Sequence, residues 1–228
     1  DANGCTCSNS RNVTVNPLPL CTITAPAAVC ATSTGNTASV PTAFGSATYN
    51  WSITGGTITA GNNTNQVTWT AGSGASANIS ITITDGNGCQ CSSSKLVTIN
   101  PLPLCTITAP AAVCATSTGN TASVPDAGGG ATYDWSITGG TITSSTPYSN
   151  SISWSAGAAG TASISITITD ANRCTCSNSV NVTVRALPNS TITTPSDVCT
   201  QSTGHNASAP DAGTGASYSW SVTGQGTL

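Results

Sequence analysis

A stretch of 26 residues occurs twice in this sequence without a single difference, and this repeat constrains the fold more than any other feature. Residues 16–41 and residues 100–125 both read NPLPLCTITAPAAVCATSTGNTASVP, and a third, diverged copy begins near Leu187. The two identical copies start 84 residues apart. A chain that repeats itself at a period of this length builds one structural unit several times. We therefore expect two complete units at 18–101 and 102–186, the C-terminal strand of a preceding unit at 1–17, and the N-terminal part of a further unit at 187–228.

Each unit is predicted to be an all-β sandwich. Short alternating runs rich in Thr, Val and Ile lie between Gly, Pro and Asn turn signals every 8–12 residues, which is typical of immunoglobulin-like sandwiches. Residues that favour long helices are scarce: Glu and Met are absent, and Lys and Arg together number four. In the first unit, the strands are expected at 21–25, 37–41, 47–54, 57–60, 65–70, 77–84 and 90–99.

The alternation within the strands predicts which side chains face the core. Ile79, Ile81 and Ile83 lie on one face of their strand, while the Ser and Thr residues between them lie on the other. In the last strand of the second unit, counting back by twos from Val180 reaches Cys176 and Cys174. The repeated Cys-x-Cys pair is therefore expected on the core side.

Eleven cysteines in 228 residues indicate an oxidising compartment and disulfides. The Cys-x-Cys spacing is too tight for a zinc site. Four cysteines per unit allow three pairings, which sequence alone does not separate. In the third unit the counterpart of Cys21 is read as Asn189, whereas Cys199 is retained, which places these two positions in different bridges. The expected pairs are Cys30–Cys89, Cys21–Cys91, Cys114–Cys174 and Cys105–Cys176.

An ordered set of short motifs gives a more specific resemblance. Val29–Cys30, the stretch from Tyr49 to Gly56, Val67 with Trp69, and the stretch from Ile81 to Cys89 occur in the same order in both units. This order resembles the PKD-like and immunoglobulin-like tandem repeats of large bacterial or archaeal cell-surface proteins and extracellular fibres. The resemblance implies a seven-stranded sandwich for each unit and a role as spacer or building block in adhesins and extracellular fibres.

Three functional hypotheses follow. The first is a disulfide-stapled, rigid structural segment of an extracellular filament or long cell-surface stalk. The second is an adhesin module that recognises a glycan or protein through the loops that differ between units, at 42–46, 60–65, 126–130 and 144–150. The third is a noncatalytic appendage of a secreted hydrolase.

The low charge bears on the partners of the chain. Only 5% of the residues are charged and the net charge is −3. Four basic residues do not make a nucleic-acid footprint, and no apolar run approaches the ~18 residues that span a membrane. Weak self-repulsion favours association of the chain with itself, either laterally or as a homopolymer.

No catalytic site is predicted, and the chain is expected not to be an enzyme. The single His205 lies in a polar turn at the position of Asn36 and Asn120 in the other units, and a catalytic histidine needs an orienting carboxylate and a nucleophile. The carboxylates that could act in pairs are spread over separate loops, at Asp85, Asp126, Asp134, Asp170, Asp197 and Asp211.

Two turns offer oxygen atoms that could bind calcium, but the sequence favours a simpler interpretation. Asp85 with Asn87 and Asp170 with Asn172 place oxygen atoms on turns, but Ca²⁺ takes six to eight oxygen ligands. Asp and Asn also stabilise tight turns through their own backbone. We therefore expect turns here and no metal site.

The side chains on the outside of the sandwiches offer sites for glycans. The triplet Asn-x-Ser/Thr, which can accept an N-linked glycan, occurs at Asn12, Asn50, Asn62, Asn78, Asn181, Asn189 and Asn206. Alternating Thr residues, such as Thr82 and Thr84, are expected on the solvent side of the sheets.

Short proline-rich joints connect successive units. Residues 16–20 and residues 100–104 both read NPLPL. Two prolines in four residues favour extended polyproline geometry with little bending. Consecutive units are therefore expected to stack end to end.

Overall fold

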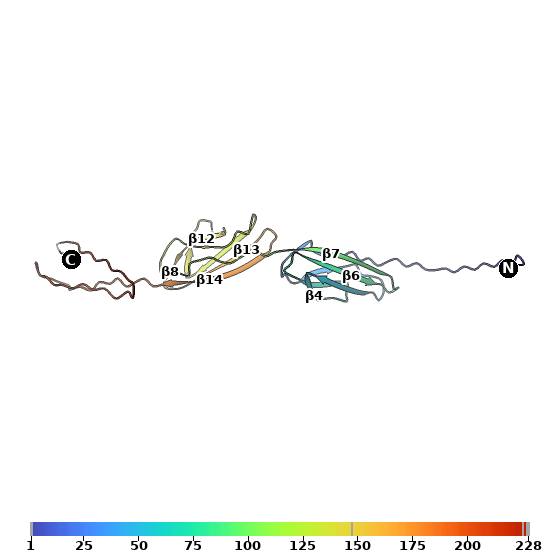
Figure 1. Ribbon diagram of the computed structural model, residues 1–228, viewed down its shortest axis with the longest axis horizontal. Helices are drawn as coiled ribbons and strands as arrows, with labels where there is room; N and C mark the ends of the chain where they lie inside the picture. The colour runs from blue at the N-terminus through green and yellow to red at the C-terminus, as the bar shows by residue number, and fades with distance from the viewer. Residues whose placement is uncertain (1, 147, 225, 227–228) are drawn as a thin grey trace.

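The computed structural model describes residues 2–146, 148–224 and 226, and in it two β-sandwiches lie one behind the other along a single axis (Figure 1). We call them unit 1 (18–101) and unit 2 (102–186). The described residues contain no α-helix, and none of their segments forms a helix able to span a membrane. The all-β prediction is confirmed.

Unit 1 consists of two packed sheets. One has the strand order β1-β7-β6-β3 and the other the order β2-β5-β4; β1 runs parallel to β7, whereas the other pairs are antiparallel. The strand bounds are β1 (Ala28–Cys30), β2 (Asn36–Ser39), β3 (Thr48–Thr54), β4 (Gly56–Ala60), β5 (Gln66–Ala71), β6 (Ser76–Thr84) and β7 (Gln90–Asn100).

Unit 2 repeats this topology strand for strand. Its sheets have the orders β8-β14-β13-β10 and β9-β12-β11, and β8 is again parallel to β14. The strand bounds are β8 (Ala112–Cys114), β9 (Asn120–Ser123), β10 (Thr132–Thr138), β11 (Gly140–Ile142), β12 (Ser151–Ala156), β13 (Gly160–Thr169) and β14 (Thr175–Arg185). The repeated sequence thus builds the same unit twice.

Each sandwich buries its own core, as the alternation predicts. In β6, Ile79, Ile81 and Ile83 are at most 2% exposed, and Trp69 of the facing sheet is completely buried. The same positions in unit 2 are equally buried. Trp51 packs at the edge of the core, where its indole N–H donates to the carbonyl oxygen of Thr64 at 2.8 Å.

The first strand lies later in the chain than the sequence predicts. Residues 21–25 contribute only an isolated bridge, Thr24 to Ser39, and the strand forms at 28–30 on the opposite sheet. Pro26 stands between the two pairings, and proline has no N–H to continue a ladder. The chain therefore changes sheets at this point, and unit 2 does the same around Pro110.

A glycine forms the tight corner between β3 and β4. Gly55 has φ +76°, and a Cβ atom there would clash with the carbonyl oxygen of Ser76. Only glycine adopts this conformation without strain at such close approach. Gly139 makes the same corner in unit 2.

The described residues before unit 1 and after unit 2 form no strands. Residues 187–224 contain one isolated bridge, Thr193 to Ser208, and leave Trp220 38% exposed. This bridge corresponds to Thr24–Ser39 in unit 1. This correspondence puts Ser190 at the position of Cys21, so the predicted match of Asn189 with Cys21 is wrong by one residue.

Candidate functional site

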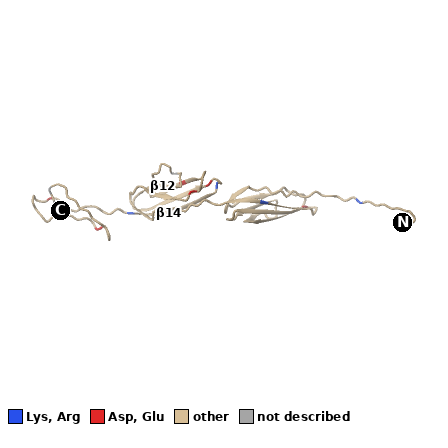
Figure 2. Ribbon diagram, turned by 45° about the horizontal axis from the view of Figure 1, so that its top comes forward, with Lys and Arg blue, Asp and Glu red and all other residues tan. Residues whose placement is uncertain are grey.

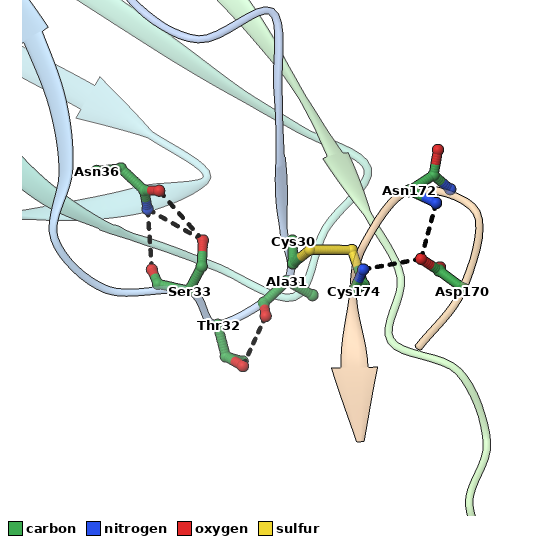
Figure 3. Close-up of a disulfide and its surroundings, with 8 residues drawn as sticks. All are labelled: Cys30, Ala31, Thr32, Ser33, Asn36, Asp170, Asn172 and Cys174. Atoms are coloured by element: carbon green, nitrogen blue, oxygen red, sulfur yellow. Dashed lines mark hydrogen bonds between the residues drawn. A yellow bond between two sulfur atoms is a disulfide. The ribbon is translucent and has the colours of Figure 1, made fainter. Parts of the chain in front are cut away.

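The two units are joined twice, once by the backbone at 100–104 and once by a disulfide. Cys30, the last residue of β1, is bonded to Cys174 in the loop before β14, with 5.5 Å between the Cα atoms (Figure 3). Cys30 belongs to unit 1 and Cys174 to unit 2, and they are 144 residues apart in the chain. We call this bond the joint disulfide.

A short loop holds Cys174 at the end of unit 2 that faces unit 1. We call this end of a unit its front end and the opposite end its rear end. The Asp170 carboxylate accepts hydrogen bonds from the backbone N–H groups of Asn172 at 2.9 Å and Cys174 at 2.8 Å (Figure 3). The N–H of Asp170 in turn donates to the carbonyl oxygen of Cys174 at 2.9 Å. Arg173 adopts φ +65° to close the loop. Cys174 is completely buried, so the loop presents its sulfur in one fixed position.

The rear end of unit 1 holds Cys30 with similar firmness. Cys30 lies in register with Asn100, the last residue of β7, and the N–H of Ala31 donates to the Asn100 carbonyl at 2.8 Å. The chain then turns through Thr32 at φ +58°. The Asn36 amide donates to the Ser33 carbonyl at 2.9 Å and closes the turn (Figure 3). The sulfur therefore lies beside the start of the joint.

The expected pairs Cys30–Cys89 and Cys114–Cys174 are wrong. Cys30 lies at the rear end of unit 1, where β7 ends, whereas Cys89 lies at the front end, with its Sγ 4.0 Å from the carbonyl oxygen of Asn16. Alternation along a strand identifies the face of a residue but not the end of the sandwich at which a loop places it. Cys89 and Cys114 are not in disulfides.

In each of the two units, the second Cys of the Cys-x-Cys pair packs against the core of its own unit. Cys176 forms a disulfide with Cys105 inside unit 2, which is the partner the sequence predicts. In unit 1, Cys21 and Cys91 occupy the same positions as thiols joined by a side-chain hydrogen bond. Burial, and then the neighbouring Cys21, raise the pKa of Cys91 to about 12. A Cys21–Cys91 disulfide stays a prediction.

The other candidate residues have local structural roles. His205 is exposed, and its Nε2 lies 2.6 Å from the hydroxyl of Ser202. It thereby closes the same turn that Asn36 closes through Ser33 in unit 1. Asp85 shapes its loop by accepting the N–H groups of Asn87 and Cys89, both at 2.9 Å. The described residues hold no group of three or more His, Cys, Asp or Glu side chains placed to bind a metal.

Charged residues are few and lie scattered along the chain (Figure 2). The seven asparagines of the Asn-x-Ser/Thr triplets are all exposed. Glycosylation of these residues stays a prediction.

A tyrosine at the front of unit 2 fixes the loop beside Cys174. The Tyr133 hydroxyl accepts the N–H of Ala127 at 2.7 Å and donates to the Asp126 carboxylate at 2.9 Å. The N–H of Gly128, followed by the Tyr133 hydroxyl, lowers the pKa of Asp126, and burial raises the pKa of Tyr133. Unit 1 has Thr42 in place of Asp126.

This pair is expected to make the stability of unit 2 depend on pH. Because the pKa of Asp126 is lower in the folded state than its ordinary value of 3.8, its carboxylate stabilises unit 2 above that value, and the stabilisation is lost as the pH falls through the folded pKa. We expect the melting temperature of the wild type to fall more between about pH 5 and about pH 2.5 than that of Asp126→Asn. Calorimetry of both proteins measures the difference.

Two controls sharpen this test. Asp134→Asn changes an exposed carboxylate on β10 and should follow the wild type. Tyr133→Phe removes one of the two donors and should fall between the wild type and Asp126→Asn. Equal acid sensitivity of wild type and Asp126→Asn would contradict the prediction.

Comparison with known protein families gives two adjacent matches. A model described as PKD-like domain matches residues 16–99 and again residues 100–184. The two matches meet at the joint. No curated protein matches the chain.

Solved structures give distant likenesses. The protocadherin gammaB7 EC3-6 cis-dimer is 12% identical with a TM-score of 0.30, and the match covers 77% of this chain and 51% of that chain. The C-terminal fragment of intimin in complex with the intimin-binding domain of its receptor Tir is 11% identical with a TM-score of 0.41, covering 77% and 66%. The fibronectin(III)-like modules of Clostridium thermocellum CbhA are 17% identical with a TM-score of 0.30, covering 72% and 95%. The chain thus spans about half the length of the protocadherin structure.

Proposed function

Because this chain belongs to the PKD-like domain family, we propose that it is a rigid structural segment of an extracellular filament or long cell-surface stalk. Tandem PKD-like domains with disulfides are extracellular structural or adhesion modules, and such domains are typically not enzymes. The single observation that carries the more specific proposal is the joint disulfide between Cys30 and Cys174.

Two covalent links between consecutive units restrict their relative motion far more than one. A backbone joint alone lets the units bend and twist about it, even where prolines keep it extended. The joint disulfide adds a second attachment, from the end of β1 to the loop at 170–174. Both ends of this disulfide are held by backbone hydrogen bonds within their own sandwiches. The two units should therefore keep a fixed relative orientation and transmit force as one rigid body.

The surface chemistry is compatible with assembly. A net charge of −3 spread over 228 residues gives little electrostatic repulsion between neighbouring copies. We propose that self-association is the main interaction of the chain, and that glycans on the exposed asparagines limit it.

Electron microscopy of the native material tests this proposal. Filaments or stalks should show beads spaced by roughly 40 Å, since the longest strands have 11 residues and a strand rises about 3.3 Å per residue. An intact mass above 22.4 kDa for this segment would show that it is glycosylated. Isolated globular particles in native preparations would contradict the proposal.

A binding role through the variable loops is the second candidate. Phe44 in unit 1 is 79% exposed and Tyr148 in unit 2 is 76% exposed, and both lie in loops that differ between the units. Exposed aromatic side chains are common in carbohydrate and protein contacts. Residue 147, within the loop at 144–150, lies outside the described residues. Binding on a glycan array that is lost in Phe44→Ala and Tyr148→Ala would favour an adhesin.

A further inference from the structure

Each unit carries a different cysteine at each of its two ends. The rear cysteine ends the first strand of the unit, in register with the last residue of the final strand: Cys30 beside Asn100 in unit 1 and Cys114 beside Arg185 in unit 2. The front cysteine ends the Asp-x-Asn-x-Cys loop, as Cys89 or Cys174. The joint disulfide connects a rear cysteine to a front cysteine.

The rear end of unit 2 has the geometry that holds Cys30 in unit 1. The N–H of Ala115 donates to the Arg185 carbonyl at 2.8 Å, and Thr116 turns the chain at φ +60°. The N–H of Ser117 donates to the Cys114 carbonyl at 3.2 Å, the same distance as Ser33 to Cys30. Cys114 differs in one respect: it is an exposed thiol.

The front end of unit 1 likewise has the geometry that holds Cys174 in unit 2. The carboxylate of Asp85 accepts the N–H of Cys89, and the N–H of Asp85 donates to the Cys89 carbonyl at 3.0 Å. The Cys89 sulfur lies against Asn16, the first residue of the joint before unit 1. Cys89 therefore occupies, relative to the joint at 16–20, the place that Cys174 occupies relative to the joint at 100–104.

We propose that Cys114 and Cys89 are attachment sites for further PKD-like units of the same sequence type, and that every joint of such an array is closed by a disulfide. Cys114 would bond the front cysteine of a unit seated behind unit 2, as Cys30 bonds Cys174. Cys89 would bond the rear cysteine of a unit in front of unit 1. The inference concerns how units are joined, so it holds or fails independently of whether the array forms a filament.

The bond forms by thiol–disulfide exchange with a small disulfide such as oxidised glutathione. The thiolate of Cys114 attacks the small disulfide, forms a mixed disulfide and releases one glutathione thiolate. The thiolate of the front cysteine then attacks the Cys114 sulfur and displaces the second glutathione thiolate. Two protein thiols are oxidised, one glutathione disulfide is reduced to two thiols, and the two protons pass to the glutathione thiolates. Exposure of Cys114 allows the first attack.

The test uses the full chain with residues 101–185 duplicated in place, which puts a complete unit behind unit 2. Two variants are compared after refolding with oxidised and reduced glutathione. The first has Cys114→Ser in the downstream copy, and the second has Cys114→Ser in the upstream copy. Free thiols are then labelled with iodoacetamide, and the peptides are mapped without reduction.

In the first variant we expect a Cys114–Cys174 peptide and loss of Cys114 labelling to background. In the second variant the remaining Cys114 is in the downstream copy, and no complete unit with a front cysteine follows that copy. This Cys114 should therefore be labelled as fully as in the original chain. Full labelling of Cys114 in both variants would overturn the proposal, and so would pairing of Cys114 with Cys105 or Cys199. If the extended chain does not fold, as judged by near-UV circular dichroism, peptides of native material decide: finding Cys114 bonded to a front cysteine supports the proposal, and finding it unbonded overturns it.

Discussion

Replacing Cys30 by serine is expected to lower the free energy of unfolding both units together by about 5 kcal/mol. The joint disulfide closes a loop between residues 144 positions apart. In the oxidised protein, the unfolded chain therefore has less conformational entropy than it would have without this loop. Without the bond, the unfolded chain gains that entropy, so the summed free energy of unfolding of the two units falls. Urea unfolding of the oxidised protein, followed by tryptophan fluorescence, measures the change.

The chain offers a matched control for this substitution. Cys114→Ser changes the equivalent position of unit 2, which is in no disulfide, and should leave the unfolding curve within about 0.5 kcal/mol of the wild type. Cys174→Ser should reproduce Cys30→Ser. Small-angle scattering should show a wider spread of interunit angles in both. Equal curves for Cys30→Ser and Cys114→Ser would show that the joint disulfide does not stabilise the pair.

Replacing Trp154 by alanine is expected to destabilise unit 2 by about 3–5 kcal/mol. The side chain is completely buried between the two sheets, and its removal leaves a large cavity in a core that has few other large side chains. Its indole N–H has no hydrogen-bond partner within the described residues, so the loss comes from burial and packing alone. Because each unit has its own core, unit 1 should keep its stability.

Differential scanning calorimetry separates the two units in this experiment. The transition of unit 2 should move to lower temperature in Trp154→Ala and that of unit 1 in Trp69→Ala, each leaving the other in place. Trp220→Ala removes a tryptophan that is 38% exposed, outside both cores, and serves as the control with little effect. A single transition that moves as a whole in either core variant would mean that the units do not fold separately.

Much of the fold could be predicted because its determinants are local. Alternation in β6 identifies Ile79, Ile81 and Ile83 as core residues, and the structure buries all three. A letter-for-letter repeat of 26 residues predicts that the chain builds the same structural unit twice. Alternation places the first strand too early, because residues 21–25 alternate well but Pro26 cannot continue the ladder.

The turn at His205 shows how far local patterns reach. The repeat predicts a turn there from Asn36 and Asn120, and the contact of His205 with Ser202 reproduces the one between Asn36 and Ser33. The loops of Asp85 and Asp170 were predicted as turns for a similar reason. In both loops, the carboxylate accepts a hydrogen bond from the backbone N–H of the residue four positions later.

The sequence by itself determined the unit, its period, its buried faces and the positions of the proline-rich joints, because each of these depends on residues that are neighbours in the chain or in one strand. Only the tertiary structure decided which cysteine lies at which end of a sandwich. Cys30 and Cys174 meet because β1 ends beside the end of β7. The 170–174 loop of unit 2 lies at the end of that unit that faces this point. A contact across 144 residues depends on how two folded bodies are placed, and side-chain alternation carries no information about that placement.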